Sequence, residues 1–232
     1  MDVVANSFRY SKRIVNILRG KDIFQRVQIT CRTLSLGNKY ACWSICPNLL
    51  SEKSVVYSIG VGEDISFDLE LIKQFGVRVH AFDPTPRSIL WVRGQNLPLQ
   101  FSFYEWGIAS HDGHSEFAPP LNPAHVSHTM ARRTISNSTL NLPVRRLSTV
   151  MQSLGHSQID LLKMDIEGAE YDVIEDILVS CLPVRQLLVE FHHRWPEVGI
   201  KRTKDALRKL NSEGYKIFNI SPSGEEYSFR KV

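Results

Sequence analysis

The sequence of 232 residues predicts an α/β fold with a doubly wound, mostly parallel seven-stranded sheet that ends in an antiparallel hairpin. Short apolar runs typical of buried strands alternate with amphipathic stretches typical of helices, and such alternation gives parallel strands joined by right-handed crossovers. A second observation concerns the end of the chain, where two strand-forming runs flank the turn Ser221-Pro222-Ser223-Gly224. A hairpin at this turn places one antiparallel strand in the sheet.

Residues 1–50 are predicted to be a basic amino-terminal helical extension. Within residues 4–18, one helical stripe carries Val4, Phe8, Val15 and Leu18, and the basic side chains Arg9, Lys12 and Arg13 lie elsewhere on the helix. Residues 1–40 hold eight Lys and Arg against two Asp, so the basic excess of the chain belongs to this segment. Such a helix packs on its own domain with a solvated charged face, or makes weak peripheral contact with a membrane through residues 1–20.

The main domain, residues 51–232, carries the regular pattern. Its predicted strands are Val55–Ile59, Val77–Phe82, Leu99–Tyr104, the run from Ile159, Gln186–Phe191, Tyr215–Ile220 and Tyr227–Lys231. Its predicted helices are Ile65–Phe75, a helix that starts at Pro86, one that follows Gly168, and Thr203–Ser212. Strands and helices thus alternate along the domain, as a parallel sheet requires.

Four scattered cysteines are too few for a disulfide framework, so we expect a reducing, cytoplasmic environment. Cys42 and Cys46 flank Trp43 but have no second Cys or His pair nearby, as a structural zinc site would require. They are interpreted as buried free thiols. No apolar run is long enough for a transmembrane helix, and the start of the chain lacks the pattern of a signal peptide.

Carboxylates cluster in the stretch Asp160–Glu170, which reads as a buried strand, a tight turn and a helix. Asp165 and Glu167 follow the strand directly, and the carboxyl ends of strands are where open α/β sheets build their sites. Gly168 permits the turn. The alternative is that these acids cap the next helix and stay solvated, and for Glu170, in the first helical turn, we favour that interpretation.

A glycine turn and an acid predict a nucleotide-like cofactor. Gly60 and Gly62 follow the first main strand, and Asp83 ends the next one, where a carboxylate can accept hydrogen bonds from a ribose diol. Dinucleotide dehydrogenases use the same logic. However, the third glycine of their motif is Ile65 here, which is poor where a pyrophosphate must approach. Acids such as Glu63 are tolerable beside a cationic methyl donor.

Three segments resemble the FkbM-like family of S-adenosylmethionine (SAM)-dependent methyltransferases. Lys163–Glu170 resembles its K-x-D-x-E-G-x-E segment, Phe82-Asp83-Pro84 its F-E-P, and Leu188–His192 its L-L-E-x-H. The resemblance runs roughly from Val55 to His192 and implies the class I, Rossmann-like methyltransferase fold, SAM as cofactor, and a hydroxyl on a small molecule or glycoside as acceptor. The family's glycine motif, D-x-G-A-N-x-G, begins with an acid, and Ser58 stands at that first position here.

Residues of two kinds are predicted to form the site. The predicted catalytic residues are His192, Asp165 and Glu167, with His192 preferred over His193 as the base because histidine titrates nearest neutrality. The predicted cofactor-binding residues are Gly60, Gly62, Glu63, Asp83, Trp106 and Asp165. No resident metal is predicted, although Asp165 could hold one that lowers the pKa of the acceptor.

The irregular stretch 119–142 is expected to form an acceptor-binding wall or a lid, because long segments without periodicity are usually functional or disordered. His125 and His128 within it could bind substrate or, with Asp165 and Glu167, a metal. We expect a small-molecule or glycoside acceptor and no nucleic-acid partner. Two alternatives remain: an NAD-dependent oxidoreductase, and a non-catalytic SAM-binding or interaction module.

Overall fold

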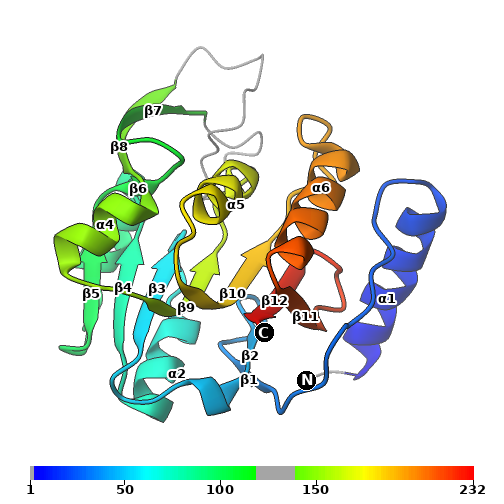
Figure 1. Ribbon diagram of the computed structural model, residues 1–232, viewed down its shortest axis with the longest axis horizontal. Helices are drawn as coiled ribbons and strands as arrows, with labels where there is room; N and C mark the ends of the chain where they lie inside the picture. Colours follow the sequence, from blue (N-terminus) through cyan, green and yellow to red (C-terminus); the bar gives the residue numbers. More distant parts are fainter. Residues whose placement is uncertain (1–2, 119–138) are drawn as a thin grey trace.

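Seven strands form the central sheet of the protein (Figure 1). The computed structural model describes residues 3–118 and 139–232, with side chains from Arg9 onward. The predicted wall or lid over 119–142, including His125 and His128, therefore lies almost entirely outside the described residues. In spatial order the strands are β11 (Tyr215–Ile220), β12 (Glu226–Lys231), β10 (Val184–Glu190), β9 (Ile159–Met164), β3 (Val55–Ile59), β4 (Arg78–Phe82) and β5 (Phe101–Tyr104).

The sheet is mixed. Strands β10, β9, β3, β4 and β5 pair in parallel, whereas β12 runs antiparallel to both β10 and β11. Every residue of β9 is buried, as expected for a central strand covered on both faces. The predicted α/β class is confirmed, and the carboxyl ends of the parallel strands meet at one edge, where the functional residues of such sheets gather.

Helices cover both faces of the sheet. The first face carries α2 (Ser66–Phe75) and α3 (Pro86–Arg93), and the other carries α4 (Leu147–Leu154), α5 (Glu170–Val179) and α6 (Gly199–Ser212). Neighbouring strand residues divide between the two cores: Leu161 packs with the first set of helices, and Leu162 with the second. This division follows from the two-residue period of a strand.

A three-stranded sheet stands beside the carboxyl edge of the large one. It comprises β6 (Gly107–Ile108), β8 (Leu140–Arg145) and β7 (Gly113–Phe117), in that spatial order. Its fit is close at Gly107, where a Cβ atom would lie 3.2 Å from Pro84 and from Val144 and 3.3 Å from Phe117. This sheet therefore walls one side of the edge that carries the predicted site.

The amino-terminal residues pack on the main domain. Helix α1 (Val3–Leu18) precedes the two-stranded sheet of β1 (Leu34–Leu36) and β2 (Trp43–Ile45), and a 3₁₀ turn, η1, spans Pro47–Leu49. Trp43 and Ile45 share a core with β3 and β4. The Gln186 side chain accepts a hydrogen bond from Cys46 N (2.8 Å) and donates one to Cys46 O (3.2 Å). Residues 34–46 thus belong to the same hydrophobic core as the sheet.

The expectation of free thiols is wrong for Cys46, which forms a disulfide with Cys31. The two cysteines are 15 residues apart, and only the fold of the amino-terminal segment brings them together. Cys42 and Cys181 are free, and Cys181 is exposed. Disulfides persist in oxidising environments, so the cysteine argument for a reducing cytoplasm no longer holds. Within the described residues, no helix is long and apolar enough to span a bilayer.

Candidate active site

A cavity of about 240 Å³ opens at the carboxyl edge of the sheet. Its walls come from the residues that follow β3, β4, β9 and β10, and from the loop that leads into β2. The charged residues among the described lining are Glu63, Asp64, Asp83, Lys163, Asp165, Glu167, Glu190 and Glu226. Seven of these eight are carboxylates, so the cavity favours a cationic ligand.

The glycine turn after β3 is fixed against β9. Gly60 has a φ of 80°, and a Cβ atom there would lie 1.7 Å from the backbone oxygen of Asp165. Lys163 Nζ donates to Gly60 O at 2.6 Å. Gly62 has a φ of 57° and open space beside its Cα. The backbone of Asp165 thus leaves no space for a side chain at Gly60. The absence of a side chain at Gly62 leaves space in the cavity wall.

Asp83 holds the glycine turn in place. Its Oδ2 accepts hydrogen bonds from the backbone N–H groups of Val61 and Gly62, each at 3.0 Å. Its Oδ1 accepts from Thr85 N at 2.9 Å and from Thr85 Oγ1 at 2.6 Å. The predicted cofactor acid is therefore buried and organises the turn that lines the cavity, a role that the sequence did not reveal.

Two other predicted cofactor residues have different surroundings. Glu63 lines the cavity and forms a bidentate ion pair with Arg87, at 2.9 Å for both contacts. Trp106 stacks near Tyr104, its ring centroid 5.2 Å away, and the Arg145 guanidinium lies 4.3 Å from the indole centroid. Trp106 is not among the described residues that line the cavity. Its contribution to a ligand site would have to be indirect.

The predicted catalytic residues lie together beside the cavity. His192 Nε2 lies 3.2 Å from Glu167 Oε2 and 3.7 Å from Asp165 Oδ1. Asp165 and Glu167 line the cavity, whereas the buried His192 lies behind them. Glu167 adopts a φ of 56°, a left-handed conformation that costs a non-glycine residue about 1–3 kcal/mol and tends to occur at functional sites.

Glu170 is the functional residue that sequence reasoning missed. Its Oε1 lies 2.9 Å from His192 Nδ1, and its carboxylate also accepts hydrogen bonds from the backbone N–H groups of Ile166 and Gly168. The expected solvated cap is therefore wrong: these bonds hold the turn before α5 rather than a helical N–H group, and the side chain is fully buried and also orients the imidazole. The signal in the sequence was an acid in the first turn of a helix that follows two strand-end acids.

Burial and the surrounding charges perturb the pKa values in this cluster. Burial alone would lower the pKa of His192, but the charges of Glu170 and Asp165 and hydrogen bonds to Glu167 and Glu170 hold it well above its usual value. Burial raises the pKa of Asp165 to about 6, despite the opposing charges of Lys163 and His192. Burial, with the neighbouring charge of Asp165, also holds the pKa of Glu190 well above its usual value. Strongly perturbed groups beside a cavity are typical of functional sites.

The Methyltransferase FkbM domain model matches residues 44–217, three quarters of the chain. The chain belongs to the FkbM methyltransferase family. Two curated relatives are both named probable methyltransferase-like protein 24. The human protein is 24% identical over 196 residues, covering 76% of this chain and 47% of its own length. The rat protein is 26% identical over 175 residues, covering 71% and 42%. The chain spans about half the length of these relatives.

Comparison with solved structures gives weaker similarities. FkbM methyltransferase from Methylobacillus flagellatus KT aligns with a TM-score of 0.48 at 12% identity, covering 78% of this chain and 44% of its own. Aeropyrum pernix fibrillarin with bound S-adenosyl-L-methionine aligns with a TM-score of 0.43 at 9% identity, covering 92% and 86%. Both scores lie below 0.5, so the family assignment rests on the family model alone.

Among the residues that the structure describes, one group of side chains in this FkbM-family site could hold a metal ion. Donor atoms of Asp165, Glu190 and His192 all lie within 4.8 Å of one another. Two carboxylate oxygens and one imidazole nitrogen suit several divalent cations. The same atoms also suit proton transfer, so the donor set alone does not choose between the two roles.

Removing the Glu170 charge is expected to lower the pKa of His192, because the charge of Glu170 is the largest influence that raises it. In the wild type, we expect the imidazole to titrate above its usual pKa of about 6.5. In Glu170→Gln the NMR titration midpoint of His192 should move toward lower pH. The variant should also lose about 1–3 kcal/mol of stability, since three donors then share weaker acceptors. An unchanged midpoint would show that Glu170 only holds the turn before α5 and does not control the pKa of His192.

A further buried carboxylate, Asp68, lies within the electrostatic influence of Lys163. Asp68, in α2, is 2% exposed, and its Oδ1 lacks a hydrogen-bond partner in the described structure. Burial raises the pKa of Asp68 to about 6, although the charge of Lys163 opposes the shift. A carboxyl whose pKa is raised on folding destabilises the protein increasingly as pH rises between its unfolded and folded pKa values.

We therefore expect Asp68→Asn to increase the free energy of unfolding around neutral pH by up to about 3 kcal/mol. Around pH 4, where the folded wild type holds the proton but the unfolded state holds it only about half of the time, the gain should fall to about 0.5 kcal/mol. Denaturant unfolding of both proteins at the two pH values measures this difference. Equal stability at neutral pH would mean that Lys163 offsets the cost of burying this carboxylate.

Proposed function

We propose that this chain is a SAM-dependent O-methyltransferase that acts on a hydroxyl of a small molecule or a glycoside. The observation that carries the proposal is the charge of the cavity, where seven carboxylates face a single lysine among the described lining residues. SAM brings a positive sulfonium and a positive α-amino group to its pocket. Charges of that sign are stabilised by such a lining.

The same charge pattern disfavours the NAD-dependent alternative. A pyrophosphate carries two negative charges, and the turn where it would approach contains Glu63 and Asp64. Ile65, at the position of the third glycine of a dinucleotide motif, is 4% exposed and packs into the core. A bulky core residue there prevents the close backbone approach that the motif provides.

In the proposed site, Gly62 leaves space for the cofactor, and Asp83 keeps the turn in its binding shape. Asp165 lines the cavity and is proposed to face both the cofactor and the acceptor. SAM supplies an electrophilic methyl group when bound. The protein's task is then to align the acceptor hydroxyl with that methyl group and to exclude water.

The acceptor side is proposed to consist of Asp165, Glu167 and His192. His192 Nε2 points toward the two carboxylates, while Glu170 binds Nδ1 and fixes the ring. Deprotonated at Nε2, the imidazole takes the hydroxyl proton, through Glu167 or through one water, as oxygen attacks the methyl carbon. We propose a small-molecule acceptor and no nucleic acid, because an acidic cavity repels a phosphodiester backbone.

Calorimetric titration tests the cofactor class. S-adenosylhomocysteine should bind at one molecule per chain, whereas NAD⁺ should give no saturable heat. Binding of NAD⁺ without S-adenosylhomocysteine would support the oxidoreductase. Turnover of any hydroxyl acceptor with SAM would exclude the non-catalytic module. Dialysis against a chelator tests for a metal. If turnover is lost and a divalent cation restores it, the metal would be assigned to Asp165, Glu190 and His192.

A further inference from the structure

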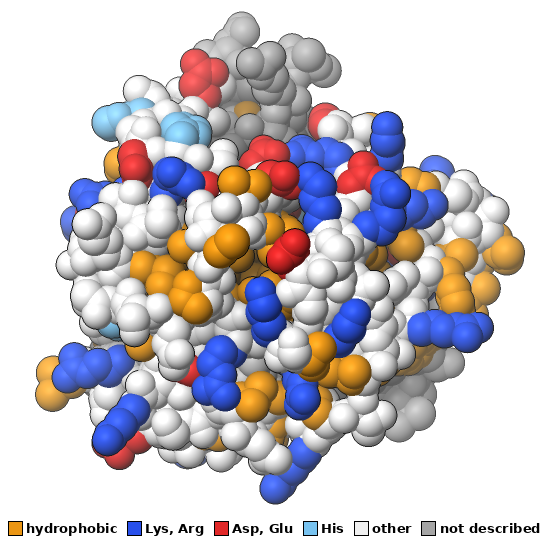
Figure 2. All heavy atoms as spheres, in the orientation of Figure 1, with side chains coloured by type: hydrophobic (Ala, Val, Ile, Leu, Met, Phe, Trp, Pro, Cys, Tyr) orange, Lys and Arg blue, Asp and Glu red, His pale blue; other side chains and the backbone are white. Residues whose placement is uncertain are grey.

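Helix α1 presents an apolar stripe to solvent. Tyr10, Ile14 and Leu18 are spaced four residues apart, so they lie along one helix face. Their exposures are 49%, 58% and 82%, and Phe24 beyond the helix is 64% exposed. On the side of the molecule where Figure 1 places α1, Figure 2 shows hydrophobic side chains together with Lys and Arg. Leaving such large side chains in water is unfavourable, which suggests that another surface covers them.

The charge around this stripe is strongly positive. Helix α1 contains Arg9, Lys12 and Arg13 and no acidic residue, and Arg19 and Lys21 follow it. Within the described part of the chain, Arg9, Lys12, Arg19 and Lys21 form no ion pair with an acidic side chain. The cations are therefore available to an anionic partner.

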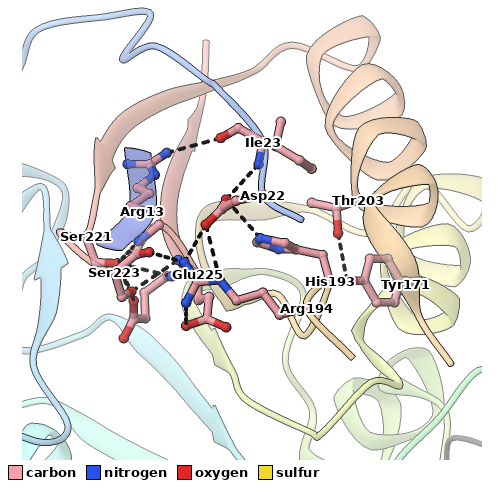
Figure 3. A network of polar contacts seen from close by, with 12 residues as sticks. Arg13, Asp22, Ile23, Tyr171, His193, Arg194, Thr203, Ser221, Ser223 and Glu225 are labelled. Atoms are coloured by element: carbon pink, nitrogen blue, oxygen red, sulfur yellow. Dashed lines mark hydrogen bonds and ion pairs between the residues drawn. The ribbon is translucent and has the colours of Figure 1, made fainter. Parts of the chain in front are cut away.

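A buried polar network holds this segment on the domain (Figure 3). Asp22, fully buried, accepts hydrogen bonds from His193 Nε2 at 3.1 Å and from Arg194 Nε at 3.1 Å. Arg194 also pairs with Glu225, in the turn between β11 and β12. Burial would raise the pKa of Asp22, but the bonds from His193 and Arg194 outweigh it and lower the pKa. The carboxylate thus stays charged and paired, so it does not offset the cations of α1.

Two further contacts fix the orientation of α1. Arg13 Nη2 donates to Ile23 O at 3.4 Å, and Ile23 is buried. Arg13 also lies against Gly224, where a Cβ atom would come within 2.3 Å of Arg13 Nε. Arg13 lies on a flank of α1 beside the stripe, so these contacts hold that flank on the domain while the stripe stays exposed.

From these observations we infer that α1 and the segment through Phe24 form a binding surface for membranes that carry anionic lipid. An apolar helix stripe with Lys and Arg on the polar face of the helix is the combination that seats a helix in the headgroup region. The unpaired cations supply attraction to anionic headgroups. They also disfavour a second copy of this chain as the occupant, because two such segments would repel each other.

Sedimentation with lipid vesicles tests the inference on the full chain. The variants are the double substitution Ile14→Glu with Leu18→Glu, and the control Leu90→Glu with Leu99→Glu. Leu90 and Leu99 are 72% and 95% exposed and lie by α3 and β5, at the sheet edge opposite β11. Both variants therefore make the same chemical change at exposed leucine or isoleucine positions.

The wild type and the control should sediment with vesicles of phosphatidylcholine and phosphatidylserine, and much less with phosphatidylcholine alone. The α1 variant should bind at least about tenfold more weakly, and molar salt should release the wild type. Equal S-adenosylhomocysteine affinity and melting temperature would show that all three proteins are folded. The inference is overturned if the wild type ignores anionic vesicles or if the α1 variant binds as well as the control. It is also overturned if the stripe instead mediates dimerisation in sedimentation velocity.

Discussion

His192→Ala is expected to lower the rate of methyl transfer by about 10²–10⁴-fold, the usual loss when a general base is removed. The affinity for SAM should change little, because His192 lies behind the carboxylates and does not line the cavity. Initial rates with any acceptor that turns over, together with calorimetry of S-adenosylhomocysteine, measure the two effects separately.

The pH dependence adds a sharper test of His192. Its raised pKa means that the imidazole holds a proton near neutrality and must lose it to act as a base. In the wild type, kcat/KM should therefore rise with pH through a value above about 6.5. In His192→Ala this rise should be absent, and the deficit should shrink at high pH, where the acceptor ionises unaided. Full activity of the variant would assign His192 a structural role.

Asp83→Asn is expected to cost about 2–4 kcal/mol of stability and to weaken cofactor binding by about 10–100-fold. Asparagine can keep one oxygen toward Thr85 but presents an NH₂ group to the N–H groups of Val61 and Gly62. The buried N–H of Val61 then loses its acceptor at about 1–3 kcal/mol, and the part-buried N–H of Gly62 loses its acceptor at about 1 kcal/mol. The released turn should no longer hold the cavity open for the cofactor. Thermal unfolding and calorimetry provide the two measurements.

Asp112→Asn is the matched control for Asp83→Asn. Asp112 also accepts hydrogen bonds from a backbone N–H and a threonine hydroxyl, those of Arg146 and Thr149, but it is exposed and is not among the described lining residues. Its substitution should lower stability slightly and leave cofactor affinity unchanged. If Asp83→Asn destabilised the protein without weakening the cofactor, the turn would be structural only.

The α/β class could be predicted from the sequence because periodicity reports burial directly. The mostly apolar run that forms β9 and the acids that follow it identified the carboxyl edge and its cluster of Asp165, Glu167 and His192. Strand ends were less certain: Leu99 has strand-forming character but is 95% exposed, and β5 begins at Phe101. Local composition does not show which residues pair with the neighbouring strand.

Features that depend on contacts across the chain could not be predicted. The Cys31–Cys46 disulfide joins residues 15 apart that come together only in the folded amino-terminal segment, whereas the sequence pattern led us to interpret Cys42 and Cys46 as free thiols. Asp83 was assigned to the cofactor, whereas its carboxylate holds the glycine turn. The link from Glu170 to His192 spans 22 residues and two elements, so no local pattern showed it.

A crystal structure with S-adenosylhomocysteine tests the central claim, that this cavity binds SAM for methyl transfer, most directly. The ligand should occupy the cavity beside Gly62, with its sulfur facing Asp165 and Glu167 and its adenosine near Asp83 and Glu63. An ordered acceptor pocket should then adjoin His192. Occupancy elsewhere, or an empty cavity at saturating ligand, would contradict the account.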